Sequence, residues 1–289
     1  SEDTPVTTAV TTNDTDLDGN IDPTSVTIVT PPANGTVSVD PLTGEITYTP
    51  DTNFNGVDTY EYQVCDDGTP LPAECDVATV TITVGAENDP PVAVDDSDST
   101  PEDTPVTTAV TTNDTDLDGN IDPISVTIVT PPTNGTLINN GDGTVTYIPN
   151  ANFNGVDTYE YQVCDDGTPL PTQCDIALVT ITVDPVNDAP VANNDSDSTP
   201  EDTPVTTAVT TNDTDLDGNI DPTSVTIVTQ PANGTVSVDP LTGEITYTPD
   251  ANFNGVDTYE YQVCDDGTPL PAQCDIALVT ITVDPVNDT

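Results

Sequence analysis

Asp58-Thr59-Tyr60-Glu61-Tyr62-Gln63-Val64-Cys65 is the stretch that decides the fold, and it recurs unchanged at residues 157–164 and 257–264. Large apolar residues alternate with polar ones along it, and successive side chains of a β-strand point to opposite faces. We therefore expect a strand whose two tyrosines and valine face a hydrophobic core. Short runs rich in Val, Ile and Thr fill the rest of the chain, separated by Pro, Gly, Asn and Asp, and they predict an all-β protein.

The same sequence is used three times. Glu2-Asp3-Thr4-Pro5-Val6 returns at Glu102 and at Glu201, and residues 2–84 differ from residues 201–283 at only five positions. A fold of about 100 residues can bury its own core. The repeats therefore predict three domains, at residues 1–87, 88–186 and 187–289, of which the last includes a C-terminal linker.

Six strands are expected in repeat 1, at residues 4–11, 25–30, 36–39, 45–49, 58–65 and 76–84. Repeats 2 and 3 have a seventh strand in front, at residues 92–96 and 191–195. Seven short antiparallel strands in about 100 residues predict a Greek-key β-sandwich. We expect the chain to be part of a longer array, and repeat 1 to have an open sheet edge that residues upstream of Ser1 would close.

The six cysteines form three regular pairs. Strand parity puts both members of a pair on the outer face of one hairpin, as a cross-strand disulfide requires. Closing a loop of this length contributes roughly 3 kcal/mol, whereas two thiols without a histidine make a poor zinc site. We expect three disulfides, and hence an oxidising, extracytoplasmic setting: Cys65–Cys75, Cys164–Cys174 and Cys264–Cys274.

The charge balance is extreme, with 52 acidic residues and no Lys, Arg or His. Nothing in the chain can neutralise phosphate, so a nucleic-acid partner and docking to an anionic membrane are excluded. No apolar run approaches the ~20 residues that span a bilayer. Self-repulsion at this charge density destabilises a compact state, and bound divalent cations are the simplest offset. The alternatives are a solvated acidic surface or an acidic disordered chain, and the many alternating segments disfavour disorder.

An acidic loop follows the first strand of residues 4–11. It reads Asn13-Asp14-Thr15-Asp16-Leu17-Asp18-Gly19-Asn20-Ile21-Asp22 and recurs at residues 113–122 and 212–221. Alternate side chains of an extended segment point the same way, so its carboxylates can converge on one hard cation such as calcium. No helix flanks the loop, and serine stands where a helical calcium loop has its bidentate glutamate.

Several motifs in fixed order resemble the cadherin-like and bacterial immunoglobulin-like tandem repeats of large surface adhesins. They are the Pro101-Glu102-Asp103-Thr104-Pro105-Val106 turn, the acidic loop, Asn134-Gly135-Thr136, Tyr147-Ile148-Pro149, Phe153-Asn154-Gly155-Val156-Asp157-Thr158-Tyr159-Glu160-Tyr161 and the linker Asn187-Asp188-Ala189-Pro190-Val191-Ala192. The resemblance covers essentially the whole chain. It implies Ig-like or cadherin-like sandwiches in an extended array, with calcium held between successive domains.

The resemblance also implies the ligands. One comes from the glutamate turn of a domain, others from the linker, and others from the acidic loop of the next domain. Together with the strand directions this gathers, at the first junction, Glu2, Asp3, Asn88, Asp89, Asp114, Asp116 and Asp118. The second junction gathers Glu102, Asp103, Asn187, Asp188, Asp213, Asp215 and Asp217.

A site closed within one domain is the alternative for this ion, formed in repeat 1 by Asp14, Asp16, Asp18, Asn20 and Asp22. The remaining candidate ligands are the equivalents of these groups in the other repeats: Asn120, Asp122, Glu201, Asp202, Asn219 and Asp221.

Three classes of function follow from these features. The first is a calcium-stiffened structural spacer of a secreted adhesin or filament, whose partners are neighbouring repeats or other copies in a fibre. The second is a repeated binding module for glycans or a cell surface, for which outward-facing apolar residues beside the disulfides are candidates: Ile176, Leu178, Ile276 and Leu278. The third is an enzyme, and we expect none, because the chain has no residue with a basic side chain and no serine with a partner base.

Overall fold

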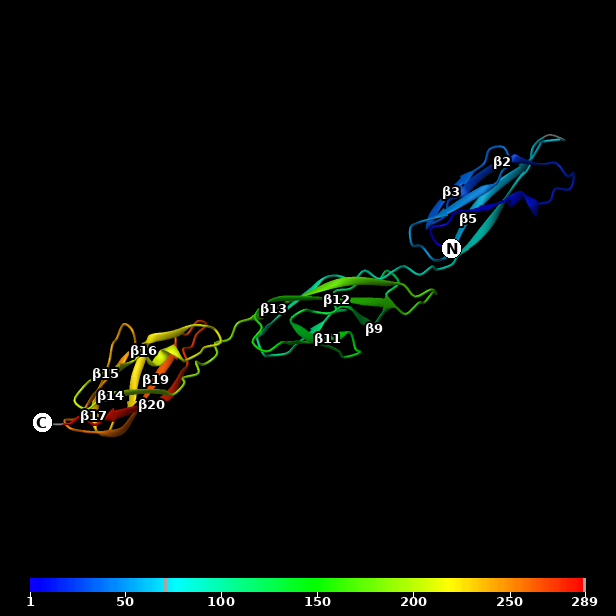
Figure 1. Cartoon of the computed structure of the whole chain (residues 1–289). Helices are drawn as coiled ribbons and strands as arrows, with labels where there is room; N and C mark the ends of the chain where they lie inside the picture. Colours follow the sequence, from blue (N-terminus) through cyan, green and yellow to red (C-terminus); the bar gives the residue numbers. More distant parts are fainter. Residues whose placement is uncertain (70–71, 288–289) are drawn as a thin grey trace.

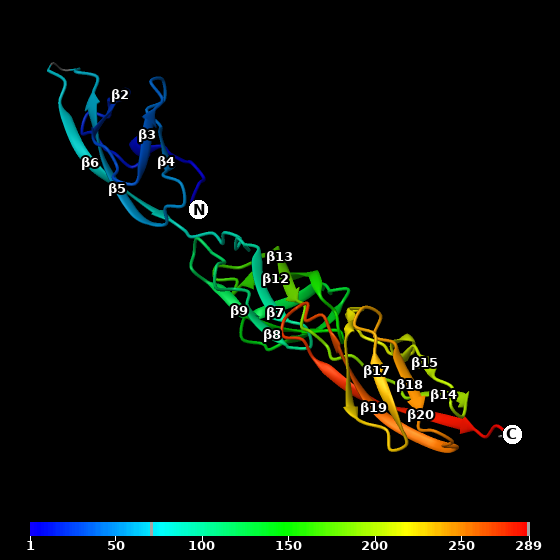
Figure 2. The same cartoon turned by 90° about the vertical axis from the view of Figure 1, so that its left-hand side faces the viewer.

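A computed structural model describes residues 1–69 and 72–287. The three repeats follow one another in an extended row, joined by single linkers (Figures 1 and 2). Each is a sandwich of two sheets, as the strand pattern predicts. The alternation of apolar and polar residues gives each sheet one buried and one solvated face.

Repeat 2 shows the complete fold. Its strands are β7 (Asp96–Pro101), β8 (Val106–Ala109), β9 (Ile121–Thr130), β10 (Gly135–Asn139), β11 (Thr144–Pro149), β12 (Gly155–Asp165) and β13 (Cys174–Asp184). One sheet has the order β7-β13-β12-β9 and the other has the order β10-β11-β8.

Repeat 3 repeats this arrangement with β14 (Asp195–Pro200), β15 (Val205–Thr207), β16 (Ile220–Thr229), β17 (Gly234–Val238), β18 (Ile245–Pro249), β19 (Gly255–Asp265) and β20 (Cys274–Asp284). Its two sheets have the orders β14-β20-β19-β16 and β15-β18-β17.

Repeat 1 has six strands: β1 (Val6–Thr8), β2 (Ile21–Thr30), β3 (Gly35–Val39), β4 (Ile46–Pro50), β5 (Gly56–Asp66) and β6 (Cys75–Val84). Its two sheets have the orders β1-β4-β3 and β2-β5-β6, and among the described residues no strand pairs with the outer side of β6. The predicted open edge of repeat 1 is therefore present.

The core of each sandwich forms around the tyrosines of the stretch that opened the sequence analysis. In repeat 2, Tyr159, Tyr161 and Val163 are at most 1% exposed and pack with Tyr147 of the facing sheet. Equivalent clusters form the cores of repeats 1 and 3. Each repeat thus has a core of its own.

All three predicted disulfides form. Cys65 lies directly opposite Cys75 in the β5–β6 pair, and the other two pairs occupy the same register. Sequence parity was sufficient to place them, because both sulfurs of a pair leave the same face of one hairpin.

Two expectations about strands were wrong. The extra strand of repeat 2 is β7 at Asp96–Pro101, not residues 92–96, and it pairs with β13 in parallel, so the sandwich is not purely antiparallel. Val92 makes only an isolated bridge to Thr115, and the Asp95 side chain accepts the Leu178 N–H, which delays the ladder to residue 96. Repeat 3 shows the same shift, with Val191 bridged to Thr214 and β14 beginning at Asp195.

The predicted first strand of repeat 1 was also too long. It ends at Thr8, and Val10–Thr12 forms a single 3-10 turn. Val10 is 4% exposed in that turn. The alternating pattern correctly indicated that Val10 is buried in the core, but a turn of 3-10 helix buries it and not a strand.

Candidate metal site at the repeat junctions

A buried glutamate, Glu2 before β1 in repeat 1 and Glu102 after β7 in repeat 2, fixes the start of each linker. Glu2 is 4% exposed, its backbone N–H donates to the Gly85 carbonyl at 2.9 Å, and its carboxylate accepts the N–H of Glu87. At the second junction Glu102 is also 4% exposed and its carboxylate accepts the N–H of Val186. Where the linker begins, its backbone is therefore hydrogen-bonded to a buried carboxylate of the preceding repeat.

The next two residues of the linker are fixed to the following repeat. The Asn88 Nδ2 group donates to Asp165 Oδ2 at 2.7 Å, and the Asp89 N–H donates to Asp118 Oδ2 at 2.9 Å. The Gln173 side-chain amide donates to the Asn88 carbonyl. Between residues 87 and 88 the chain thus passes from contacts with one domain to contacts with the next.

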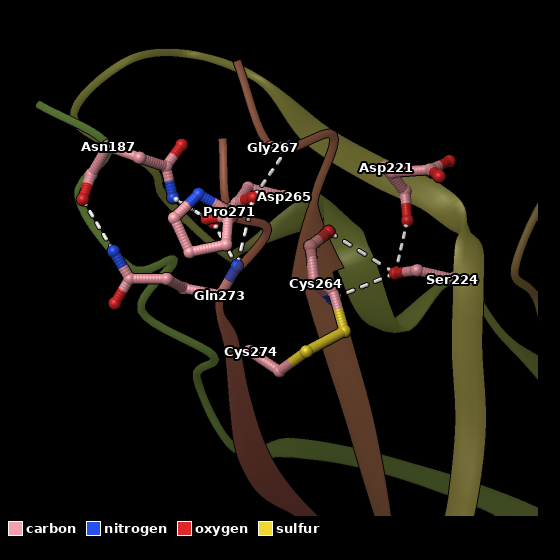
Figure 3. Close-up of a disulfide and its surroundings, with 9 residues drawn as sticks. All are labelled: Asn187, Asp221, Ser224, Cys264, Asp265, Gly267, Pro271, Gln273 and Cys274. Atoms are coloured by element: carbon pink, nitrogen blue, oxygen red, sulfur yellow. Dashed lines mark hydrogen bonds between the residues drawn. A yellow bond between two sulfur atoms is a disulfide. The ribbon is translucent and has the colours of Figure 1, made fainter. Parts of the chain in front are cut away.

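The second junction repeats these contacts (Figure 3). Asn187 is 6% exposed, and its Nδ2 group donates to Asp265 Oδ2 at 2.9 Å and to the Pro271 carbonyl at 3.2 Å. The Gln273 side-chain amide donates to the Asn187 carbonyl. The linker lies beside the Cys264–Cys274 hairpin, whose turn supplies these partners.

Carboxylates from both neighbouring domains reach the linker. Burial, and then the negative charges of Asp118, Glu2, Asp3 and Asp116, raise the pKa of Asp89. Burial and the charges of Asp217, Glu102, Asp103 and Asp215 do the same for the pKa of Asp188. The raised pKa of each aspartate reflects first its burial and then the repulsion from these carboxylates, and a bound cation would offset both.

Several buried oxygens at the junctions have no hydrogen-bond partner. They are Asp116 Oδ2 and Asn120 Oδ1 in repeat 2, Asp215 Oδ2 and Asn219 Oδ1 in repeat 3, and Oδ1 of the linker residue Asn187. A buried oxygen without a partner is costly. Carboxylate and amide oxygens together are the ligands that a hard cation takes, so the residues present fit such an ion.

The acidic loop itself is shaped by one carboxylate. Asp116 Oδ1 accepts the N–H groups of Asp118 and Gly119, at 2.8 and 3.1 Å, and this turn leaves Oδ2 of Asp116 free. Asp16 and Asp215 make the same turn in repeats 1 and 3. Gly119 has a φ of 72°, a conformation that glycine adopts without strain.

Other predicted ligands are engaged inside their own repeat. The Asp114 carboxylate accepts the Tyr161 hydroxyl and the Val94 N–H, and Asp122 Oδ1 accepts the Ile124 N–H. Asp14 and Asp213 accept tyrosine hydroxyls, and Asp22 and Asp221 accept the N–H two residues on.

The turn aspartates likewise point to their own repeat. Asp3 and Asp103 accept the N–H of Asn53 and Asn152, and Asp202 accepts that of Asn252. Glu201, which follows β14, accepts the N–H of Val286 in the segment after β20. The candidate ligands that remain at the first junction are therefore Glu2, Asn88, Asp89, Asp116 and Asp118. At the second junction they are Glu102, Asn187, Asp188, Asp215 and Asp217.

Three or more Asp, Glu, Cys or His side chains do not gather closely enough to hold a metal ion anywhere in residues 1–69 and 72–287. The candidate donor set accordingly mixes carboxylates with amide oxygens. The five-residue site closed within repeat 1 is not gathered as one group, because Asp14 and Asp22 face different partners, and the Asn20 side-chain amide donates to Asp67 and to the Thr69 carbonyl.

Sequence reasoning missed Asp165 and Asp265. Asp165 is 2% exposed, and its carboxylate accepts the N–H groups of Gly167 and Gln173 as well as the Asn88 amide. Asp165 lies two and four residues after Val163 and Tyr161, so strand parity points it inward at the end of β12. An acidic residue at an inward position of a strand end was the available signal.

The sequence itself matches a known family along most of its length. A model of the bacterial Ig domain family matches residues 1–83, 88–182 and 187–282. The chain belongs to the bacterial Ig domain family. No curated protein sequence matches it.

Solved structures similar to these bacterial Ig repeats are cadherin repeats. Mouse cadherin-23 EC22-24 has a TM-score of 0.59 at 17% identity, over 95% of this chain and 89% of that one. Mouse protocadherin-24 EC1-3 has a TM-score of 0.57 at 22% identity, over 90% of each chain. A protocadherin gammaB7 EC3-6 cis-dimer has a TM-score of 0.59 at 19% identity, over 94% of this chain and 67% of that one. These likenesses confirm the Ig-like or cadherin-like tandem fold.

Among the described residues, no helix is long and apolar enough to cross a membrane. Bacterial Ig and cadherin-like repeats are typically extracellular and non-enzymatic.

Proposed function

We propose that this chain is a stalk segment of a secreted bacterial surface adhesin or extracellular filament, stiffened by calcium at its repeat junctions. Tandem Ig-like or cadherin-like repeats with one disulfide each fit an adhesion or stalk role. The near-identity of repeats 1 and 3 supports a spacer, because a spacer needs one module used many times. We also propose that the domain boundaries lie between residues 87 and 88 and between residues 186 and 187.

The observation that carries the proposal is the double attachment of each linker. Glu87 is bonded to the buried glutamate of repeat 1, and Asn88 to the buried aspartate of repeat 2. A linker fixed in this way on both sides transmits the orientation of one sandwich to the next. A calcium ion would complete the attachment by joining oxygens of both domains and of the linker.

Calcium suits the available ligands. The proposed ligands at the first junction are Glu2, Asn88, Asp89, Asp116, Asp118 and the Asn120 amide oxygen, and they are carried by two domains and a linker. Calcium accepts six to eight oxygens in flexible geometry, whereas magnesium requires a rigid octahedron. Which residues hold the ion is part of the proposal.

The three disulfides are the second support, because they fit an oxidising environment. Six of six cysteines are in disulfides, and such bonds persist outside the reducing cytoplasm. The net charge of −52 also favours a setting rich in divalent cations.

Calorimetric titration with calcium tests this function. We expect two equivalent binding events in the chain, one for each junction, and a rise in the thermal midpoint that chelation reverses. Magnesium at the same concentration is the control and should produce a smaller rise. Absence of calcium binding at millimolar concentration would refute the calcium part of the proposal.

A repeated binding module is the second candidate, and one surface favours it. Ile176, Leu178, Ile276 and Leu278 are 37–47% exposed on the outer face beside the disulfides. The corresponding positions in repeat 1 are the smaller Val77 and Thr79. Binding to glycan arrays by repeats 2 and 3, lost on Leu278→Thr and Leu178→Thr, would support this function over the spacer.

A further inference from the structure

The smaller sheet of repeat 2 is longer than its counterparts in repeats 1 and 3. β8 includes Ala109, which pairs with Thr144 at the start of β11. The equivalent strands β1 and β15 end one residue earlier, and β4 and β18 begin one residue later. The position of Thr144 is Glu45 in repeat 1 and Glu244 in repeat 3. Repeat 2 therefore gains one residue pair in this sheet and lacks a carboxylate there.

Two isoleucines lie on the outer face of this sheet. Ile138 of β10 is 51% exposed, and Ile148 also faces outward, because it alternates with buried residues along β11. Ile138 lies opposite Thr146 and Ile148 lies opposite Thr136, so the two isoleucines are diagonal neighbours on one face. Both positions are polar in the other repeats: Ser38 and Thr49 in repeat 1, and Ser237 and Thr248 in repeat 3.

The polar side chains of this face are held by one another. The hydroxyls of Thr107 and Thr146 are hydrogen-bonded at 2.8 Å, and Asn140 Nδ2 donates to the hydroxyls of Thr144 and Thr146 at 2.9 and 3.1 Å. Repeat 1 has Asp40 at the position of Asn140, and repeat 3 also has an aspartate. Side chains that are already fixed lose little conformational entropy when another surface packs on them.

The charge pattern of this face indicates what kind of partner it fits. β8, β10 and β11 contain no charged residue. The turn between β10 and β11 has one carboxylate, Asp142, and its Oδ1 atom accepts the N–H and the hydroxyl of Thr144. The same turn in repeat 1 carries both Asp40 and Glu45.

Loss of carboxylates favours a second acidic surface over a basic one. The chain has a net charge of −52 and no Lys, Arg or His, so contact between two copies brings only negative side chains together. Carboxylates that meet across an interface cost free energy, and a self-contact therefore requires a face without them. A basic partner would instead favour a face that keeps its acidic residues.

We propose that the outer face of the β8–β11–β10 sheet of repeat 2 binds the same face of a second copy of this chain. Because both copies use the same surface, the contact is isologous and closes as a pair. The stalk function does not require this lateral contact, and the contact does not depend on calcium.

The size of the face makes this pairing weak between single chains. Three strands about 4.8 Å apart and about five residues long present roughly 250 Å². A stable complex buries about 800 Å² on each partner. The contact therefore becomes effective where chains already lie side by side, since a high local concentration compensates for low affinity.

A cysteine at the centre of the face measures the contact in the whole chain. All native cysteines are in disulfides, so Thr146→Cys introduces a single free thiol. A bismaleimide should join two copies of this variant about tenfold faster than two copies of Thr47→Cys or of Thr246→Cys, because the contact raises the effective thiol concentration. These two controls place the thiol at the same position in repeats 1 and 3, so any association through other parts of the chain affects all three proteins.

Two further changes in the Thr146→Cys protein test the chemistry of the contact. Ile138→Ser with Ile148→Thr introduces the residues of repeat 1, which that fold accommodates, and should lower the cross-linking rate to that of the controls. Thr144→Glu restores the glutamate of the other repeats and should lower the rate at low salt but not at high salt, because salt screens the repulsion. Equal rates at the three cysteine positions, or a rate that the isoleucine replacements leave unchanged, overturn the proposal and exclude a second copy as the partner of this face.

Discussion

The side-chain amide of Asn88 donates to the carboxylate of Asp165 at 2.7 Å, although the two residues are 77 positions apart in the chain. Asn187 and Asp265 make the same bond at the next junction. This pair links the residue that follows a domain boundary to a carboxylate that is buried in the next domain. It leaves the Oδ1 atom of Asn187 buried without a partner, where a cation can use it.

Replacing the linker asparagine should release one junction only. Asn187→Ala leaves the buried Asp265 carboxylate without one donor, at a cost of about 1–3 kcal/mol. We expect the second junction to lose calcium binding while the first keeps it, so a titration shows one event instead of two. Asn88→Ala is the matched control and should abolish the other event. Two unaltered binding events in either variant would show that the linker amide is not a ligand.

The linker carbonyl requires a donor in the facing hairpin. Gln173 and Gln273 donate to the carbonyls of Asn88 and Asn187, but repeat 1 has Glu74 at this position, and an ionised carboxylate cannot donate. Gln173→Glu should weaken the attachment by about 1–2 kcal/mol. The expected readout is faster proteolysis within residues 85–91. Glu74→Gln is the control and should leave this rate unchanged, and equal rates for both variants would contradict the role given to Gln173.

Each disulfide should stabilise its own repeat. Cys264 and Cys274 close a hairpin with a sequence separation of 10, and removing such a bond costs about 3 kcal/mol in the chain-entropy model. The double variant Cys264→Ser/Cys274→Ser should lower the midpoint of denaturant unfolding for repeat 3 and leave repeats 1 and 2 unchanged. A shift shared equally by all three repeats would show that they do not unfold independently.

A buried carboxylate should make repeat 1 sensitive to acid. Burial raises the pKa of Asp58, but the N–H groups of Asn34, Thr59 and Ala33 and the Tyr48 hydroxyl donate to the carboxylate, outweigh burial and hold the pKa below its usual value. A lowered folded-state pKa contributes stability that is present above the unfolded value of about 4 and is lost as the pH falls through the folded value.

The variant Asp58→Asn should remove this pH dependence. It should also cost about 1–3 kcal/mol at neutral pH, because an amide accepts fewer of these bonds. The measurement is the unfolding free energy of repeat 1 between pH 7 and pH 2, with the exposed Asp51→Asn as control. An unchanged slope below pH 4 would assign the acid sensitivity to other carboxylates.

The sequence predicted most of the fold because its period is strong. Tyr60 and Tyr62 alternate with polar residues, and this alternation placed both the core and the outward cysteines. The position of β7 was missed because its own sequence, Asp96–Pro101, contains no large apolar residue. Its pairing depends on β13 and on side chains such as Asp175, which are far away in the sequence.

The candidate site was predicted only in outline. The alternation of carboxylates in the acidic loop predicted that Asp114, Asp116 and Asp118 converge on one ion. Instead, Asp114 accepts the Tyr161 hydroxyl, and Asp116 accepts N–H groups of its own turn. A tertiary partner therefore overrides the local pattern at the first position. Asp165 was missed because it is a single acidic residue at the end of a strand. It does not belong to an alternating acidic motif such as that of the acidic loop.

Small-angle scattering with and without a calcium chelator tests most directly whether ions set the junctions. With calcium, the maximum dimension and the pair-distance distribution should be those of a rigid row of three sandwiches. After chelation, repulsion among the carboxylates around Asp89 and Asp188 should loosen the linkers, broaden the distribution and lower the thermal midpoint. Identical scattering curves and midpoints under both conditions would contradict a calcium-stiffened stalk.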